Sequence, residues 1–327
     1  MAVPNSLRPH PAISEVRAAV RRFLTAHRTG DVVAVACSGG TDSLALAAAT
    51  VHCAGRLGVA VHGLIVDHGL QPGSGSVAQT AAQALRGLGC AAVRVLPTAV
   101  EGPGGPEAAA RRARYAELRA VAPAGALVLL GHTLDDQAET VLLGLGRGSG
   151  PRSVAGMREL DPPWGRPLLG VRRAVTAAAC DALGLVPWSD PHNADPRFQR
   201  VRLRTEVLPL LEDVLAGGVA PALARTAGQL QEDLDLLDRQ ADALLVQALD
   251  VTELNVAALD VTVLAQAPAT LRRRVLRRWL LDSGVTELTD AHLRTADDLV
   301  GRWSGQGAVR LPGDVELFRA HGRLQLS

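Results

Sequence analysis

The 327-residue chain contains no lysine, so all 34 of its Lys/Arg positions are arginine. A Walker loop requires Gly-x4-Gly-Lys-Ser/Thr, and the absence of lysine excludes that phosphate-binding motif. Any clamp on an anion must therefore use guanidinium groups, which suit planar, bidentate contacts with phosphate. With 33 acidic residues the formal net charge is only +1, so only local basic patches can attract a nucleic acid.

Cysteines are few and scattered, at Cys37, Cys53, Cys90 and Cys180. None has C-x-x-C spacing, so neither a zinc ribbon nor a redox pair is indicated, and reduced thiols in a cytosolic protein are predicted. The chain also lacks an apolar leader at its N-terminus and any apolar run long enough to cross a bilayer. These absences predict a soluble, cytoplasmic protein with no membrane partner.

One stretch predicts a buried strand, a glycine turn and a helix start. Residues 32–36 are continuously apolar, and the segment from Ser43 to about Leu57 is rich in Ala and Leu. Between them, free N–H groups at a helix N-terminus and glycines that admit a phosphate make an anion site. The residues expected to contact phosphate are Ser38, Gly39, Gly40, Thr41, Asp42 and Ser43. The alternative is an ordinary, well-capped strand-to-helix turn.

Strands alternate with helices along the first half of the chain. An amphipathic helix is predicted at 13–27, further strands at 59–66, 91–96 and 126–130, and further helices at 73–88 and 107–120. This order predicts an α/β fold with a doubly wound, mostly parallel sheet, whose ligands lie beyond the carboxyl ends of the strands. The predicted division is a catalytic domain (1–211), a helical linker (212–250) and a small, mainly helical domain (251–327) that ends in a strand pair within 309–326.

A second polar cluster begins the helix that follows the fourth strand. His132, Asp136 and Glu139 are spaced i, i+4 and i+7, which places them on one helical face. The opposite face, expected to be buried, contains Ala138, Val141, Leu142 and Leu145. A carboxylate pair beside the phosphate turn would hold Mg²⁺ on ATP or bind an amine. The alternative is a solvated, well-capped helix start.

These motifs resemble a known family. Ser-Gly-Gly-Thr-Asp-Ser at 38–43 resembles the PP-loop of the N-type ATP pyrophosphatases, which cut ATP between its α and β phosphates. His-x3-Asp-x2-Glu-Thr at 132–140, followed by Arg-Gly-Ser-Gly at 147–150, resembles the signature of tRNA(Ile)-lysidine synthetases. Matching motifs follow in order between about Val32 and Leu211, at 67–70, 107–115, 166–169 with Arg173, 190–195 and 198–209.

The resemblance implies an adenine nucleotide α hydrolase-like fold and a ligase that forms a carbon–nitrogen bond. The expected substrates are ATP with Mg²⁺, L-lysine and the isoleucine tRNA with a CAU anticodon. C2 of the wobble cytidine is activated as an adenylate with release of pyrophosphate, and the ε-amine of lysine then displaces AMP to give lysidine.

The resemblance also assigns roles to residues. Asp42 is expected to hold the ATP-bound Mg²⁺, Asp67 and His68 to bind ATP, and His132 to bind nucleotide or relay a proton. Asp136 and Glu139 are expected to grip the ammonium of lysine. The arginines expected to neutralise charge at the α-phosphate are Arg111, Arg147, Arg200 and Arg204. The alternatives are a helix cap for Asp42, a structural histidine, and surface arginines or salt bridges.

Two arginine stripes are candidates for RNA binding. In the first, Arg197, Arg200 and Arg204 share a helical face. The residues expected to contact tRNA are Arg202, Arg272, Arg273, Arg274, Arg277 and Arg278. A solvated helix face is the alternative. The family pattern is broken at Gln71, where arginine is frequent, and at Val201, where asparagine is common.

Two other functions stay open, as does the oligomeric state, for which a homodimer is one possibility. Another PP-loop tRNA modifier, such as a cytidine thiolase, would need cysteines clustered for sulfur or an iron–sulfur site, and those of this chain are dispersed. A nucleotide- and RNA-binding protein without turnover would release no pyrophosphate.

Overall fold

The computed structural model describes residues 9–28, 30–69, 73–98, 106–148, 150–190, 195–251 and 257–327. The chain forms two compact units that divide between Gln229 and Leu230, inside the long helix α10 (Val219–Ala248). The boundaries of the catalytic domain at 211 and of the helical linker at 250, inferred from the sequence, stay predictions.

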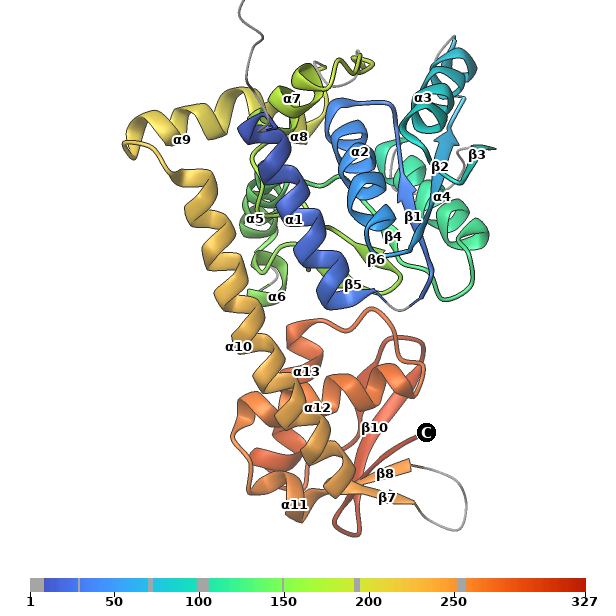
Figure 1. Ribbon diagram of the computed structural model, residues 1–327. Helices are drawn as coiled ribbons and strands as arrows, with labels where there is room; N and C mark the ends of the chain where they lie inside the picture. Colours follow the sequence, from blue (N-terminus) through green and yellow to red (C-terminus); the bar gives the residue numbers. More distant parts are fainter. Residues whose placement is uncertain are drawn as a thin grey trace, which may run out of the picture. The chain divides into compact units, whose positions relative to one another are not determined.

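The first unit is built on a six-stranded sheet with the order β3-β2-β1-β4-β6-β5 (Figure 1). Its strands are β1 (Val32–Ala36), β2 (Ala60–Asp67), β3 (Ala92–Pro97), β4 (Val128–Leu129), β5 (Leu160–Asp161) and β6 (Trp164–Gly165). All neighbours pair in parallel except β5 and β6, which form an antiparallel hairpin at the edge. The predicted mostly parallel sheet is confirmed. The edge hairpin was not predicted, because two-residue strands have no readable period.

Helices cover both faces of this sheet. They are α1 (Pro11–His27), α2 (Thr41–Gly55), α3 (Ser74–Leu88), α4 (Pro106–Val121), α5 (Leu134–Arg147), α6 (Pro151–Val154), α7 (Arg173–Ala182), α8 (Gln199–Arg202), α9 (Leu208–Val214) and the start of α10. Alternate residues of β1 point to opposite faces. Val33 and Val35 join a core with α1, α2, α3 and α7, whereas Ala34 and Ala36 join a second core with Leu118 of α4. The sheet is therefore doubly wound, as the uninterrupted apolar sequence of β1 predicts.

The second unit pairs helices with a five-stranded antiparallel sheet of order β7-β8-β11-β10-β9. Its strands are β7 (Leu249–Val251), β8 (Ala257–Asp260), β9 (Val309–Leu311), β10 (Val315–Ala320) and β11 (Arg323–Leu326), and its helices are α11 (Val261–Ala265), α12 (Ala269–Asp282) and α13 (Asp290–Gly301). The expected strand pair in 309–326 is three strands, and 257–260, expected to be helical, is a strand. Four residues are too few to distinguish the helical period of 3.6 residues from the strand period of two. The strand β8 is instead fixed by its pairing with β11.

In the described part of the chain, no single helix has both the length and the apolar character needed to cross a membrane. Only the segments 199–214 and 219–248 taken together meet that test, and they are bent by 95° at the break between them.

Candidate active site

The glycine turn after β1 leaves the N-terminus of α2 without a side-chain cap. Gly40 is the N-cap residue, and no side chain accepts a hydrogen bond from the first turn of α2. The Ser43 hydroxyl instead donates to the Gly40 carbonyl (2.8 Å) and accepts from the Ser38 amide (3.2 Å), which closes the turn on itself. Gly39 adopts φ +81°, a conformation that favours glycine. The geometry is that of an open anion site rather than a capped turn.

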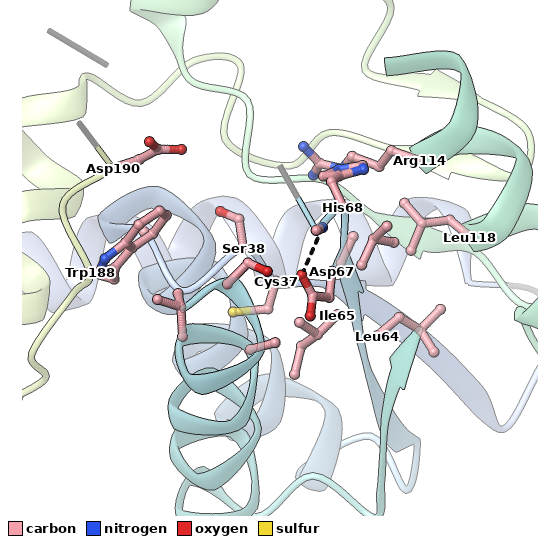
Figure 2. A pocket seen from close by; sticks show the side chains of 17 residues that line it. Cys37, Ser38, Leu64, Ile65, Asp67, His68, Arg114, Leu118, Trp188 and Asp190 are labelled. Carbon is pink, nitrogen blue, oxygen red and sulfur yellow. Dashed lines mark hydrogen bonds between the residues drawn. The ribbon is translucent and has the colours of Figure 1, made fainter. Parts of the chain in front are cut away.

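A cavity of about 330 Å³ lies beside this turn, at the carboxyl ends of β1 and β2. Among the residues predicted to bind ATP, its walls contain Ser38, Gly40, Asp67 and His68. Figure 2 shows Trp188 and Arg114 on opposite sides of the cavity, and the sequence alone assigns a role to neither. Asp67 accepts a hydrogen bond from the Gly69 amide (3.1 Å), which holds the carboxylate at the rim.

Two histidines border the site as neutral imidazoles. Burial lowers the pKa of His68, and the Arg114 guanidinium lowers it further. Burial also lowers the pKa of His132 to about 3. The Nδ1 atoms of both rings are buried and lack a hydrogen-bond partner among the described residues. His68 also lines the cavity, whereas His132 is not among the residues that line it.

The carboxylate of Asp42 contacts α7 and does not cap its own helix. It accepts hydrogen bonds from the Thr176 hydroxyl and from Arg173 Nε (3.3 Å). Burial raises the pKa of Asp42, and the nearby Asp136 adds to the rise, even though Thr176 and Arg173 act in the opposite direction. The negative charge of Asp42 is thus only partly compensated by Thr176 and Arg173.

Close backbone packing brings α5 next to this acid. A Cβ added at Gly131 would lie 3.1 Å from the backbone of Asp42 and Ser43, closer than most side-chain carbons come, so glycine favours this approach. Thr133 is the N-cap of α5 and forms a reciprocal capping box with Asp136, whose Oδ2 accepts from the Thr133 amide (2.8 Å). His132 therefore precedes the helix, and the predicted single helical face for all three polar residues is wrong.

The predicted buried face of α5 also needs correction. Ala138 and Val141 are buried, but Leu145 is 54% exposed. Gly144 is buried in its place, because a Cβ there would lie 2.0 Å from the carbonyl oxygen of Ser153, where α6 crosses. Glu139, assigned from the sequence to the polar face, is fully buried.

Glu139 is buried because three arginines surround it. Its Oε1 lies 2.8 Å from Arg204 Nε and 3.5 Å from Arg173 Nη1, and its Oε2 lies 3.7 Å from Arg200 Nη1. Asp136 Oδ1 lies 2.6 Å from Arg173 Nη2 and 3.6 Å from Arg204 Nη2. We call the set of Asp42, Asp136, Glu139, Arg173, Arg200 and Arg204 the carboxylate–arginine cluster, in which three guanidinium groups balance three acids.

The charges of this cluster set the protonation of Asp136. Burial acts to raise its pKa, but Arg173 and the two hydrogen bonds from Thr133 outweigh that effect and hold the pKa below its usual range. Asp136 is therefore held as an anion, whereas the raised pKa of Asp42 lets it accept a proton more readily than Asp136 does.

The helical pitch changes between the two arginines that reach Glu139. Residues Leu203–Val207 form a π-helical turn in which the Leu208 amide donates to the Leu203 carbonyl. Such turns occur frequently at functional sites. Arg204 reaches Glu139 from this turn, and Arg200 reaches it from α8, which directly precedes the turn. Arg197 lies before α8 and pairs with Asp195 (2.6 Å). The prediction that Arg197 shares a helical face with Arg200 and Arg204 is therefore wrong.

Several predicted site residues lie outside the cluster. Arg111 is exposed and stacks on Tyr115, with 5.0 Å from its Cζ to the ring centroid. Arg147 is exposed and donates to the Leu143 carbonyl (3.2 Å). Arg202 is 60% exposed and pairs with Glu206 four residues later. The catalytic roles of Arg111 and Arg147 and the RNA contact of Arg202 remain predictions.

The arginine stripe of α12 is largely engaged within its own unit. Arg272 lies 2.7 Å from Asp297, Arg273 lies 3.8 Å from the same carboxylate, and Arg274 lies 2.6 Å from Asp238. Arg278 is exposed and pairs with Asp282. Arg277 is half-buried. These pairs favour a structural role for Arg272 and Arg274, and RNA binding by the stripe stays a prediction.

Sequence reasoning assigns no role to Arg173, Thr176 or Arg114. Arg173 and Arg114 belong to motifs that resemble the family, and this resemblance is the only feature of the sequence that points to a role for them. Thr176 lies three residues after Arg173 and so on the same side of α7, but nothing in the sequence indicates that this side meets Asp42.

The donors at the turn fit a hard cation. Mg²⁺ is commonly bound by one or two carboxylates together with substrate phosphates. Asp42, with its raised pKa, and Asp136 offer oxygen ligands beside the open phosphate site. Among the described residues, no group of three or more His, Cys, Asp and Glu side chains is arranged to hold a metal.

Known proteins match both units. Residues 13–211 match the family described as PP-loop domain, and residues 259–325 match the TilS substrate binding domain. The chain is 58% identical over 325 residues to the tRNA(Ile)-lysidine synthase of Rhodococcus jostii, covering 97% of this chain and 96% of that protein. It is 57% identical over 318 residues to that of Nocardia farcinica, with coverage of 95% and 97%.

Among solved structures, the U34-tRNA thiolase NcsA from Methanococcus maripaludis aligns with a TM-score of 0.57 over 68% of this chain and 80% of its own. At 18% identity this likeness shows the PP-loop fold alone. The match of the PP-loop domain over more than half of the chain, and the identity to curated relatives over nearly its whole length, settle the family. The chain belongs to the tRNA(Ile)-lysidine synthases.

Proposed function

We propose that this chain joins L-lysine to C2 of the wobble cytidine in an isoleucine tRNA with a CAU anticodon, at the expense of ATP. One observation carries the proposal. The uncapped phosphate turn after β1 holds Asp42, and Arg173 links Asp42 directly to Asp136 and Glu139. An anion site and a set of buried carboxylates thus share one centre.

In the first step the O2 atom of cytidine attacks the α-phosphorus of ATP, the bond between the α-phosphorus and the bridging oxygen breaks, and pyrophosphate leaves. The uncapped amides of α2 bind the phosphates through hydrogen bonds and the helix dipole. Arg200 and Arg204 are partly exposed guanidinium groups at the mouth of the cluster and neutralise the charge that develops on the leaving group. A Mg²⁺ ion held by Asp42, when bound, would screen the phosphates.

In the second step the ε-amine of lysine attacks C2 of the adenylated cytidine, AMP leaves, and the nitrogen loses protons. Asp136 and Glu139 are the acids we assign to the lysine ammonium, but arginines already occupy both. The lysine ammonium therefore binds Asp136 and Glu139 only when Arg200 and Arg204 turn from Glu139 toward the phosphates. Asp42, with its raised pKa, is a better proton acceptor than Asp136.

The cavity beside the turn is proposed to hold the adenosine of ATP. Trp188 offers an aromatic face, and the neutral His68 offers a ring nitrogen without a protein partner among the described residues. The reaction is placed in the cytoplasm, where ATP, free lysine and tRNA are available together. The oligomeric state remains a prediction.

The test is incubation of the purified full chain with ATP, labelled lysine and the tRNA, followed by the mass of the released nucleoside. A cytidine heavier by one lysine minus water, with AMP and pyrophosphate in equal amounts, is the expected result. Incorporation of sulfur would instead support a thiolase, and binding of ATP and tRNA without pyrophosphate would support a non-catalytic protein.

A further inference from the structure

A second concavity, whose charged lining residues are all basic, lies on the first unit, between α1 and the C-terminal half of α2. Its volume is about 460 Å³. Arg17 and Arg21 of α1 face His52 and Arg56 of α2 across it, and no acidic residue of the described chain lines it. We call this the α1–α2 groove. Nothing in the proposed reaction uses it.

The arginines of the groove lack the partners that other surface arginines have. Arg202, Arg278 and Arg310 each pair with an acid four residues later. Arg17, Arg21 and Arg56 form no ion pair with any acid of the described chain. Four residues after Arg17 stands another arginine, a like-charge spacing that costs an isolated helix about 0.2–0.5 kcal/mol.

The helix dipole does not account for this arrangement. A cation at the end of α2, such as Arg56, is stabilised by the dipole, but Arg17 and Arg21 lie in the middle of α1, where the dipole has no effect. Packing does not account for it either, because Arg21 and Arg56 are exposed. Since the chain as a whole is nearly neutral, a local concentration of unpaired guanidinium groups is the feature expected of a polyanion site.

The groove is separate from the phosphate turn. His52 follows Asp42 by ten residues on α2, a rise of about 15 Å along the helix. Of the residues that line the groove, only His52 is aromatic, and the three guanidinium groups suit contacts with the phosphates of an RNA backbone. We propose that the α1–α2 groove binds the sugar–phosphate backbone of the RNA substrate, away from the nucleotide that reacts. This inference rests on the proposed function in that the RNA is the tRNA to be modified.

The test compares the full chain with the double variant R17Q/R21Q by filter binding of the tRNA across a series of salt concentrations. The expected result is a dissociation constant about tenfold higher and a log–log salt slope shallower by about one to two, since each lost phosphate contact removes roughly 0.7–0.9 from the slope. Pyrophosphate release at saturating tRNA should keep its kcat, while the KM for tRNA rises. The control is R294Q/R310Q, which removes two exposed arginines that already have acidic partners, and should change neither quantity.

An unchanged salt slope for R17Q/R21Q would overturn the inference. A second result would also overturn it. If inorganic phosphate raises the melting temperature of the unaltered chain but not that of R17Q/R21Q, while both bind tRNA equally well, the groove holds a small anion and not the RNA backbone. A melting temperature equal to that of the unaltered chain shows that the variant is folded. Failure of the proposed function is a separate outcome, in which the unaltered chain binds tRNA with the expected slope but forms no lysidine.

Discussion

Arg173 Nη2 lies 2.6 Å from Asp136 Oδ1, and this contact joins the first turn of α7 to the first turn of α5. The same guanidinium reaches Asp42 on α2 and Glu139 on α5. Burial acts against its charge, but the four nearby acids, led by Asp136, raise the pKa of Arg173. One side chain thus fixes the distance between the phosphate turn and the acids proposed for lysine.

Replacing Arg173 with lysine should disrupt the site, because an ammonium is a point charge that cannot contact three carboxylates in a plane. We expect pyrophosphate release to fall at least about a hundredfold and the free energy of unfolding to fall by about 1–3 kcal/mol, less than for a fully buried pair because the side chain is 26% exposed. Urea denaturation and a pyrophosphate assay measure both. The control is R172K, since Arg172 is 44% exposed and Asp135 is its one ion-pair partner among the described residues. Equal effects of the two variants would refute the bridging role.

The variant D42N should abolish pyrophosphate release and leave tRNA binding intact. The pKa of Asp42 is higher in the folded chain than in the unfolded chain. Ionisation of Asp42 therefore lowers the free energy of unfolding as pH rises above the pKa of the unfolded chain. The neutral amide should therefore be at least as stable as the acid at pH 7, which thermal unfolding can check. D135N, at an acid that caps α7 through the Arg173 amide, is the matched control and should keep turnover. Turnover of D42N within about tenfold of the unaltered chain, about 1.4 kcal/mol of barrier, would exclude the role of Asp42.

The variant E139Q tests the proposed lysine site. We expect the KM for lysine to rise at least about tenfold, and the lysine-dependent step to slow more than pyrophosphate release. The fold should also lose stability, because removal of a fully buried carboxylate leaves Arg204 without its closest acid. Steady-state kinetics with lysine as the varied substrate measure the effect. In the control E206Q, the lost pair with Arg202 is exposed to solvent and should change neither stability nor the KM for lysine measurably. An unchanged KM would place lysine elsewhere.

The variant G131A should push α5 away from the phosphate turn. Its Cβ would lie 3.1 Å from backbone atoms of Asp42 and Ser43, which cannot move aside as a side chain can. Overpacking of this kind costs about 1–3 kcal/mol, and we expect pyrophosphate release to fall with it. The control is G146A within α5 itself, where a Cβ meets nothing within 4 Å. That change should stabilise the protein by about 0.5–1 kcal/mol, because alanine is the better helix former. A harmless G131A would show that the close approach is not required.

Mild acid should weaken the fold through two partly buried histidines, His68 and His132. The pKa of His132 lies at about 3 in the folded chain and near 6.5 when unfolded, so the unfolded state binds more protons between these values. The free energy of unfolding should therefore fall as pH drops below about 6.5. His68 contributes in the same direction. Imidazole NMR shifts should show a neutral His132 at pH 5, and the pH dependence of unfolding should be flatter in H132Q. Titration of His132 near pH 6 would contradict its burial.

Much of this protein follows from local sequence. The apolar run of β1, the two glycines and the Ala-rich helix define a strand, turn and helix through short-range sterics and hydrogen bonding, and the ordered motifs indicate the family. The same motifs mark Asp42, Asp136, Glu139, Arg200 and Arg204 as candidate site residues. These are properties of neighbouring residues, which a linear pattern can report.

Tertiary packing decided which of those residues meet. Glu139 is buried because arginines from two distant segments, Arg173 and Arg200–Arg204, converge on it, whereas Arg111 and Arg147 point to solvent. Leu145 is exposed because α6 packs against the side of α5 that carries Gly144 and leaves Leu145 uncovered. The charge balance of the cluster depends on distances between α2, α5 and α7, and no spacing within a single segment encodes those distances.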